Sequence, residues 1–379
     1  MKIAYVFDRP LPARETDSEQ AIQTIAGFAR QGAQVTLVLP ARGALPSARE
    51  LAAHYQVTGD FEVQPAPTPF GQFEFGRKWW HAIRAHELPA VADADVVYTR
   101  NFPTLLALAE GKRQFAYETY RPWHEQFPVL APLFRRAMAA PRFLGAILHS
   151  HFACDRYRAL GVDERRLLVA HNGHDPSRFA SPPPQRELRA ALGLPLDRKL
   201  VVYTGHVNLT KGLDTVLRMA RRRPDVSFVL VGSEGTGVIE LLARRAPNVA
   251  VVGWQAFDVV ARYLMAADVL LQPPSRVPLK LVGNTVLPMK LFLYLAAGRP
   301  IIAPDLPDMR ELLEHEGNAL LVPPGDDDAA VRALERILGE PGLADRLSAA
   351  ARQAARGLTW DARASRILAF LERRRSEGR

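Results

Sequence analysis

The sequence has few of the features that mark secreted, membrane-spanning or nucleic-acid-binding proteins. It contains a single cysteine, Cys154, which excludes an internal disulfide and is typical of a reducing compartment. No run reaches the roughly 18 to 20 apolar residues that a transmembrane helix needs, and residues 1–7 are typical of a strand rather than of a signal peptide. Zinc-ligand spacings and nucleic-acid-binding motifs are absent as well. We therefore expect a cytoplasmic protein without a nucleic-acid partner.

Lysine is scarce, although the chain is basic. Seven lysines occur among 49 basic residues, and the formal net charge is +9. The arginines are scattered over the expected helices, so most of the charge is expected on solvated helix faces. A peripheral contact with an anionic membrane, at its inner face, stays open as a second interpretation. In such a chain, a lysine at a junction between a loop and a helix points to anion binding more strongly than usual. Nothing in the sequence points to an oligomeric state.

The length of 379 residues indicates two domains of roughly 150 to 200 residues each. In both halves apolar strands alternate with amphipathic helical stretches, which is typical of parallel, doubly wound α/β sheets. The expected strands lie at residues 2–7, 34–39, 96–99, 114–118, 144–149 and 167–170 in the first half, and at 200–203, 226–231, 249–252, 269–272, 300–303 and 319–322 in the second. Residues 59–75, which contain several prolines, are expected to form a loop with weak strand character at its start.

A proline-rich stretch separates the two halves. Residues 181–184 (SPPP) predict a stiff linker, so we expect an N-terminal domain at 1–180 and a C-terminal domain at 185–358. Residues 359–379 predict a terminal helix that packs back on the N-terminal domain. Two doubly wound domains that face each other across a cleft bind ligands at the carboxyl ends of their strands.

The most informative stretch runs from residue 284 to residue 305. Residues 289–297 are apolar at helical spacing, Gly298 ends the helix, and a short buried strand follows. Lys290 lies in the first turn, where unpaired backbone N–H groups and the helix dipole already favour an anion. The stretch therefore predicts a phosphate site. The alternative is a buried helix whose lysine faces solvent.

A second lysine opens a helix after the first strand of the C-terminal half. Residues 204–212 read TGHVNLTKG, in which Gly205 lets a ligand approach the backbone and Lys211 stands at the helix start, where it can meet a diphosphate. His206 is mostly uncharged at neutral pH and would be a weaker clamp than an arginine. Gly232 ends the next strand in a similar turn. The alternative is an ordinary connection between strand and helix.

These motifs resemble the nucleotide-sugar-binding half of retaining glycosyltransferases with the GT-B fold, especially the large family 4. The resemblance rests on P-x-K-L-F-x-Y-L-A-A-G-x-P-I-I at 288–302, on K-G at 211–212 and on an ordered set of weaker matches between residues 200 and 340. The N-terminal half resembles the family less. The family implies two Rossmann-like domains and transfer of a sugar from a nucleotide-diphosphate donor of the UDP or GDP type. It also implies retention of configuration without a metal ion or cofactor.

The resemblance implies roles for particular residues. Lys211 and Lys290 would act as catalytic residues that neutralise the diphosphate, and Tyr120 or His124 would face the transferred sugar. The residues that it implies for donor binding are Gly205, His206, Gly232, Asn248, Asn284, Thr285, Met289 and Glu311.

Two acidic residues of the family are missing. Their positions hold Thr285, which supplies only a hydroxyl, and Leu293, which supplies no hydrogen-bonding group. Loss of one charged hydrogen bond weakens a donor site about ten- to a hundredfold, and Asn284 or Glu311 would substitute for the missing contacts. Chemistry would persist, because the lysines rather than the acids stabilise the leaving diphosphate.

The leading hypothesis is a glycosyltransferase of glycan biosynthesis whose N-terminal domain holds a saccharide, lipid-linked or small-molecule acceptor. The missing acids favour an alternative, in which the chain has lost catalysis and acts as a carbohydrate- or nucleotide-binding partner of other enzymes. A sugar-nucleotide epimerase on the same architecture is a further alternative. An NAD-dependent oxidoreductase is disfavoured, because no G-x-G-x-x-G follows the first strand.

Overall fold

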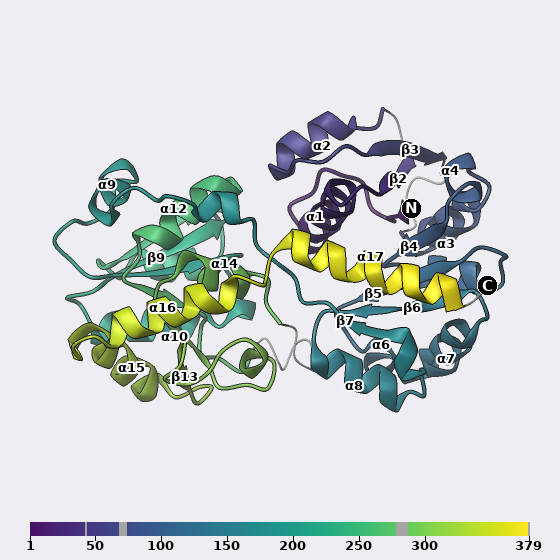
Figure 1. Cartoon of the computed structure of the whole chain (residues 1–379). Helices are drawn as coiled ribbons and strands as arrows, with labels where there is room; N and C mark the ends of the chain where they lie inside the picture. The colour runs from purple at the N-terminus through teal and green to yellow at the C-terminus, as the bar shows by residue number, and fades with distance from the viewer. Residues whose placement is uncertain (42–43, 68–73, 278–286, 378–379) are drawn as a thin grey trace. The chain divides into compact units, whose positions relative to one another are not determined.

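The computed structural model describes residues 1–41, 44–67, 74–277 and 287–377. Its contacts divide the chain into two compact units, shown in Figure 1. The N-terminal unit comprises Met1–Asn172 together with Trp360–Arg379, and the C-terminal unit comprises Gly173–Thr359. The last helix of the chain therefore belongs to the N-terminal unit, whereas residues 173–184 belong to the C-terminal unit.

The described part of the N-terminal unit contains a parallel sheet of seven strands in the order β3-β2-β1-β4-β5-β6-β7. Its strands are β1 (Lys2–Val6), β2 (Gln34–Ala41), β3 (Glu62–Pro67), β4 (Val96–Thr99), β5 (Phe115–Thr119), β6 (Phe143–Leu148) and β7 (Leu167–Val169). The central strands β1, β4, β5 and β6 are almost entirely buried, which is expected where helices cover both faces of a parallel sheet.

Two helices from opposite ends of the chain pack against each other in this unit. They are α1 (Thr16–Arg30) and α17 (Trp360–Glu377), which also contacts β6. Gly145 in β6 makes room for α17, because a Cβ at this position would lie 2.4 Å from the ring of Phe370. The other helices of the unit are α2 (Ala48–Tyr55), α3 (Glu74–Ala85), α4 (Pro89–Ala92), α5 (Phe102–Ala109), α6 (Trp123–Gln126), α7 (Ala131–Ala139) and α8 (His151–Ala159), with 3-10 turns at Pro128–Leu130 and Glu164–Arg166.

The edge strand β3 corrects the expectation of a loop over residues 59–75. It pairs in parallel with β2 from Glu62 to Pro67, although it contains two prolines. An edge strand tolerates proline, because one side of its backbone has no partner strand to which it must donate.

The C-terminal unit contains a second parallel sheet, of six strands within the described residues, in the order β10-β9-β8-β11-β12-β13. Its strands are β8 (Leu200–Thr204), β9 (Ser227–Ser233), β10 (Val249–Gly253), β11 (Val269–Leu271), β12 (Ile301–Pro304) and β13 (Leu320–Val322). The strand order reverses beside β8, and such a switch point is where open α/β sheets bind ligands, at the carboxyl ends of the strands.

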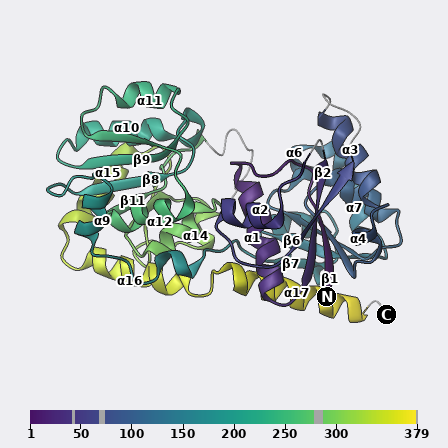
Figure 2. The same ribbon diagram turned by 90° about the horizontal axis from the view of Figure 1, so that it is seen from above.

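Helices cover both faces of this second sheet. One core lies between the sheet and α12 (Phe257–Ala266), α14 (Lys290–Ala297) and part of α16 (Leu343–Ala355), and the other between the sheet and α10 (Leu213–Arg222), α11 (Val238–Ala243) and α15 (Asp327–Gly339). Figure 2 shows these two helix layers above and below the strands. The remaining elements are α9 (Gln185–Ala191) and 3-10 turns at Pro176–Phe179, Leu209–Lys211 and Met309–Glu311.

The fold class is confirmed: two doubly wound α/β sheets, followed by a C-terminal helix. The periodicity of the sequence located all six strands of the C-terminal sheet and the helix that begins at Lys290 and ends at a left-handed Gly298. None of the helices that the structure describes combines the length and the apolar character that a membrane span needs.

Candidate functional site

Two glycines bring the ends of adjacent strands together at the carboxyl edge of the C-terminal sheet. Gly205, after β8, has φ of +123°, and Gly232, in β9, has φ of +114°. A Cβ on Gly232 would lie 2.6 Å from the carbonyl oxygen of Gly205, so the two backbones approach more closely than any other residue allows. The Gly205 N–H donates to the Val231 carbonyl at 2.9 Å, which fixes the loop.

Lys290 reaches this pair of glycines from the first position of α14. Its Nζ lies 3.9 Å from the centre of the Tyr203 ring, and an added Cβ on Gly205 would lie 3.0 Å from the same nitrogen. The helix is tied to the sheet one turn later, because the Thr204 N–H donates to the Tyr294 hydroxyl at 3.1 Å. The lysine is therefore held over the end of β8.

In the part of the chain that the structure describes, no acid neutralises the ammonium group of Lys290. Its pKa is well below the ordinary value of 10.5, first because the half-buried side chain is desolvated and second because Lys211 repels it. Among the residues that the structure describes, no carboxylate forms an ion pair with it. The face of Tyr203 offers only the partial compensation of a cation–π contact.

Lys211 completes a pair of cations at this edge. It ends the 3-10 turn Leu209–Lys211, and Gly212, in the left-handed conformation, then leads into α10. Within the described residues, neither α10 nor α14 has a side-chain cap at its N-terminus. The N–H groups of Leu291 and Phe292 donate to the carbonyls of Pro288 and Met289 in the first turn of α14. Two lysines near two helix N-termini make this edge a candidate site for an anion with more than one charge.

His206 lies at the rim of this site. Its side chain is 42% exposed, its Nδ1 lies 3.6 Å from Glu234 Oε1, and its carbonyl accepts a hydrogen bond of 3.0 Å from the Tyr203 hydroxyl. The structure thus brings together Lys211, Lys290, Gly205, Gly232 and His206.

Asn248 is not among them, which corrects its expected place in the nucleotide pocket. It precedes β10 and therefore lies at the amino edge of the sheet, opposite to the glycines. Its amide donates to three backbone carbonyls, those of Ala220, Arg223 and Val226, at 2.9 Å each. This pattern ends α10 and holds the turn into β9, so the side chain has a structural role.

The remaining donor-binding candidates fall into two groups, described and not described by the structure. Met289 precedes α14 and is half-buried, and Glu311 ends the 3-10 turn that follows β12. Asn284 and Thr285 lie outside the residues that the structure describes. Leu293, which replaces a family acid, packs against the apolar core of the unit.

The two candidates in the N-terminal unit have different surroundings. Tyr120 follows β5 and is half-buried, and the guanidinium of Arg121 lies 4.9 Å from its ring centre. His124, in α6, is 7% exposed and packs against the rings of Tyr157 and Phe134. Burial lowers its pKa below 6.5, so it is a neutral, buried residue and not one that is accessible to a sugar.

Sequence reasoning missed a buried polar cluster in the same unit. Glu118, in β5, is fully buried and accepts hydrogen bonds from the Tyr98 hydroxyl at 2.8 Å and from Arg363 at 2.6 Å. Its Oε1 also lies 2.6 Å from His149 Nε2. Arg363 and the other hydrogen-bonding neighbours lower the pKa of Glu118 against the opposing effect of burial. No local motif signals this cluster, because its members come from four separate parts of the chain.

Within the described residues, no group of three or more His, Cys, Asp or Glu side chains is arranged to hold a metal ion.

Comparison with known proteins places the chain in a family. Residues 184–354 match the model of the family described as glycosyl transferases group 1, and residues 19–178 match that described as glycosyltransferase family 4. The two matches cover most of both units. The chain belongs to the group 1, family 4-like glycosyltransferases of the GT-B fold.

Individual relatives share only a limited part of their sequence with this chain. The chain is 30% identical over 228 residues to the D-inositol 3-phosphate glycosyltransferase of Xylanimonas cellulosilytica, a match that covers 56% of this chain and 53% of the relative. The chain thus spans about half the length of the curated relatives it matches.

Two solved structures share the whole fold. HepE from Anabaena, in complex with UDP, aligns with a TM-score of 0.74 and 17% identity over 98% of this chain and 100% of that one. Sucrose-phosphate synthase from Thermosynechococcus elongatus aligns with a TM-score of 0.77 and 17% identity over 98% of both chains.

Proposed function

We propose that this protein transfers a sugar from a nucleotide-diphosphate donor to a saccharide, lipid-linked or small-molecule acceptor. The observation that carries the proposal is the pair of lysines at the carboxyl edge of the C-terminal sheet, with Lys290 held over Gly205 and no carboxylate among the described residues to neutralise it. A diphosphate is an anion of the right charge for this site. Because HepE, which shares the fold, was solved with UDP, a uridine nucleotide is the first donor to test.

The residues of the site would have different roles in donor binding and catalysis. Lys290 and Lys211 would neutralise the charge that develops on the diphosphate as the bond to the sugar breaks, which is the step where preorganised cations accelerate a reaction most. Gly205 and Gly232 would admit the nucleotide to the backbone, and His206 would contact the phosphates from the rim. Met289 and Glu311, together with Asn284 and Thr285 in the segment outside the described residues, would complete the donor site.

The N-terminal unit would hold the acceptor. Tyr120 is the candidate to face the transferred sugar, because it follows β5 at the carboxyl edge of the sheet and is partly accessible, whereas the buried His124 is not. Retention of configuration and independence of metal are parts of the proposal that follow from the family. A peripheral contact with an anionic membrane would suit a lipid-linked acceptor.

The proposal is tested by incubating the purified protein with UDP- and GDP-sugars, with and without EDTA, and by following release of the nucleoside diphosphate. Release that depends on an added acceptor and survives EDTA supports a metal-independent transferase. The anomeric configuration of the product, read from proton NMR couplings, then tests retention.

A non-catalytic role is the second candidate, favoured by one observation. Leu293 is half-buried and packs against the core, and as a leucine it supplies no acid at that position of α14. A protein of this kind would bind the nucleotide but release no diphosphate with any acceptor. Nucleotide binding without turnover would therefore distinguish it from the transferase.

A further inference from the structure

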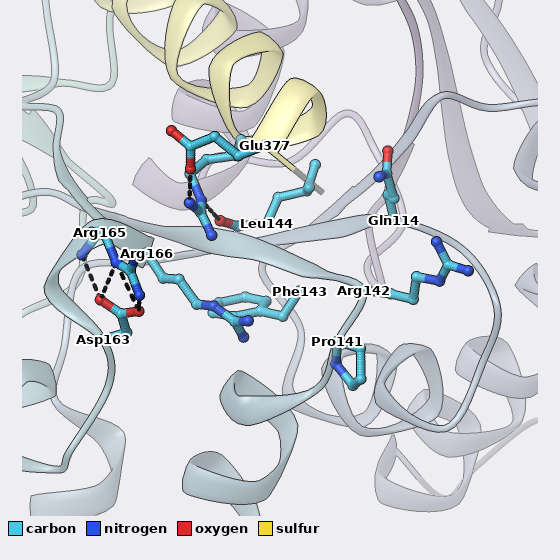
Figure 3. A pocket seen from close by; sticks show the side chains of 10 residues that line it. Gln114, Pro141, Arg142, Phe143, Leu144, Asp163, Arg165, Arg166 and Glu377 are labelled. Carbon is cyan, nitrogen blue, oxygen red and sulfur yellow. Dashed lines mark hydrogen bonds and ion pairs between the residues drawn. The ribbon is translucent and has the colours of Figure 1, made fainter. Parts of the chain in front are cut away.

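A basic cavity lies in the N-terminal unit, at the sheet edge opposite to Tyr120 and His149. Its volume is about 260 Å³, and it lies at the amino ends of β5, β6 and β7 beside the end of α17. Figure 3 shows Asp163, Arg165 and Arg166 on one side of the cavity and Gln114 and Arg142 on the other. The residues that complete its lining are Pro141, Phe143, Leu144, Arg374 and Glu377.

Two of the four arginines in this lining already have carboxylate partners. Arg165 forms a forked ion pair with Asp163, with Nη2 and Oδ2 2.9 Å apart, and Arg374 pairs with Glu377. The other two, Arg166 and Arg142, form no ion pair with any residue that the structure describes. The lining thus carries four guanidinium groups against two carboxylates, a net of two positive charges.

Arg166 is held in place by its backbone contacts. Its Nη1 donates to the carbonyls of Met138 at 2.9 Å and Ala140 at 3.0 Å, at the end of α7. Its Nε and Nη2 make no hydrogen bond within the described part of the chain, although the side chain is half-buried. Arg374 is similarly fixed, because its Nε donates to the Leu144 carbonyl at 3.2 Å. Fixed guanidinium groups lose little conformational freedom when a ligand binds.

The arginines repel one another in the absence of a ligand. The pKa of Arg166 is below its ordinary value, first because the group is desolvated and then because Arg374 and Arg165 lie near it. Guanidinium groups stay protonated at any physiological pH, so this repulsion persists until an anion enters. The cavity is smaller than the roughly 300–1,000 Å³ of sites for whole organic ligands, which suits a single phosphoryl group rather than a nucleotide.

We propose that this cavity is a second anion site, which binds a phosphate dianion through Arg166 and Arg374, with Arg142 adding positive charge from the opposite side of the lining. The ligand would be inorganic phosphate or the phosphomonoester of a larger molecule, such as an anionic lipid headgroup. It would cross-link the start of β6 to the end of α17 and thereby stabilise the N-terminal unit. The site is separate from the donor site, since all of its residues belong to the N-terminal unit.

The test uses the full chain carrying Lys290→Met, so that phosphate binding at the donor site doesn't contribute. Thermal unfolding is followed as inorganic phosphate replaces chloride at constant ionic strength. Arg142→Glu is the main variant, because the Arg142 side chain is exposed and forms no ion pair with any residue that the structure describes. Arg166→Gln is the second variant, and Arg49→Gln, an exposed arginine on α2, is the matched control.

We expect phosphate to raise the unfolding temperature, and both cavity variants to weaken the apparent affinity by about tenfold or more, whereas the control leaves it unchanged. Vesicles of phosphatidylcholine with and without phosphatidic acid form the second arm. Binding to the phosphatidic acid vesicles alone, lost in Arg142→Glu, would support the site and assign it to a lipid headgroup. The proposal is overturned if neither probe binds, or if Arg142→Glu binds as tightly as its parent.

Discussion

Arg363, in the last helix of the chain, donates a hydrogen bond of 2.6 Å to Oε1 of Glu118, which lies 245 residues earlier in β5. Both side chains are buried, at 4% and 0% exposure. The pair ties α17 to the sheet of the N-terminal unit, so the end of the chain contributes a charge to the interior of the unit formed by its beginning. Arg363 also donates to the hydroxyl of Thr24 in α1, at 3.0 Å.

Breaking this pair from one side should destabilise the N-terminal unit strongly. Glu118→Gln leaves the buried guanidinium of Arg363 without its carboxylate, a change that costs about 3–5 kcal/mol in comparable cases. The double variant Glu118→Gln/Arg363→Met should lose less than the sum of the two single variants, because neither charge is then left alone. Hydrogen exchange of peptides from β5 and α17 reports the opening free energy of this unit.

Asp163→Asn is the matched control for that cycle. Its ion pair with Arg165 is exposed, so its loss should cost less than about 1 kcal/mol. An equally small effect of Glu118→Gln would show that the buried pair doesn't hold α17 in place.

His149 should make the N-terminal unit less stable as the pH falls. Burial lowers its pKa from 6.5 to about 4, against the favourable contact with Glu118. Between these two values the unfolded chain binds a proton that the folded chain does not, so stability is present above 6.5 and is lost as the pH approaches 4. Glu118, whose pKa is lowered, adds a further loss only below its ordinary value of 4.5.

His149→Gln tests this pH dependence, because glutamine keeps a donor near Glu118 but doesn't titrate. The unfolding free energy should fall less steeply between pH 6.5 and 4.5, and the slope that remains should come from other buried histidines with lowered pKa, such as His81 and His124. If the unfolding free energy of His149→Gln depended on pH as steeply as that of the parent, the pH dependence would not come from His149.

Lys290→Met should stabilise the C-terminal unit while it removes nucleotide binding. The folded state penalises the charge of Lys290, since its pKa is well below 10.5, and this penalty is fully present at pH values below the folded pKa. Methionine fills a similar volume without a charge, so we expect the free energy of unfolding to rise by about 1 kcal/mol. Gains of this size are common where a functional residue reduces the stability of the folded state. Lys199→Met, at a position 60% exposed, should change neither property. A loss of stability in Lys290→Met would show that its charge is compensated in the folded protein.

Gly232→Ala should disrupt the donor site and the fold around it. The new Cβ would meet the Gly205 carbonyl oxygen at 2.6 Å, at a backbone conformation that alanine rarely adopts. The strain should cost on the order of 1–3 kcal/mol and move the loop after β8, with loss of nucleotide affinity. At Gly357 nothing lies within 4 Å of an added Cβ, so Gly357→Ala is the control. Normal affinity in Gly232→Ala would mean that the contact between the two loops doesn't shape the site.

The sequence predicted the roles of residues most accurately where a role follows from the neighbours along the chain. Lys290 and Lys211 could be selected because each stands at a junction between a loop and a helix, where backbone N–H groups are unpaired. The helix after Lys290 and its glycine stop follow from local periodicity and backbone freedom. The prediction for Asn248 was wrong, because a residue before a strand lies at the amino edge of the sheet. There its side-chain amide donates to three backbone carbonyls.

Other features lay beyond local patterns. His124 stands between Trp123 and the polar residue Glu125, and no spacing in the sequence shows that the fold brings Phe134 and Tyr157 around it. Strand β3 was expected only as weak strand character at the start of a loop, because proline lowers the expectation of a strand unless its position at an edge is known. Arg363 and Glu118 meet only because the last helix returns to the first unit, so their pairing needed the tertiary structure.

The donor site itself is tested most directly by calorimetric titration of the purified protein with UDP, GDP and ADP, repeated on Lys211→Ala and Lys290→Met. The account predicts that one of these nucleotides binds with micromolar affinity, and that each variant weakens its binding by about tenfold or more. Lys199→Met should bind as the parent does. Failure of all three nucleotides to bind to the folded protein, or binding that survives in both variants, would contradict the assignment of Lys211 and Lys290 to a diphosphate.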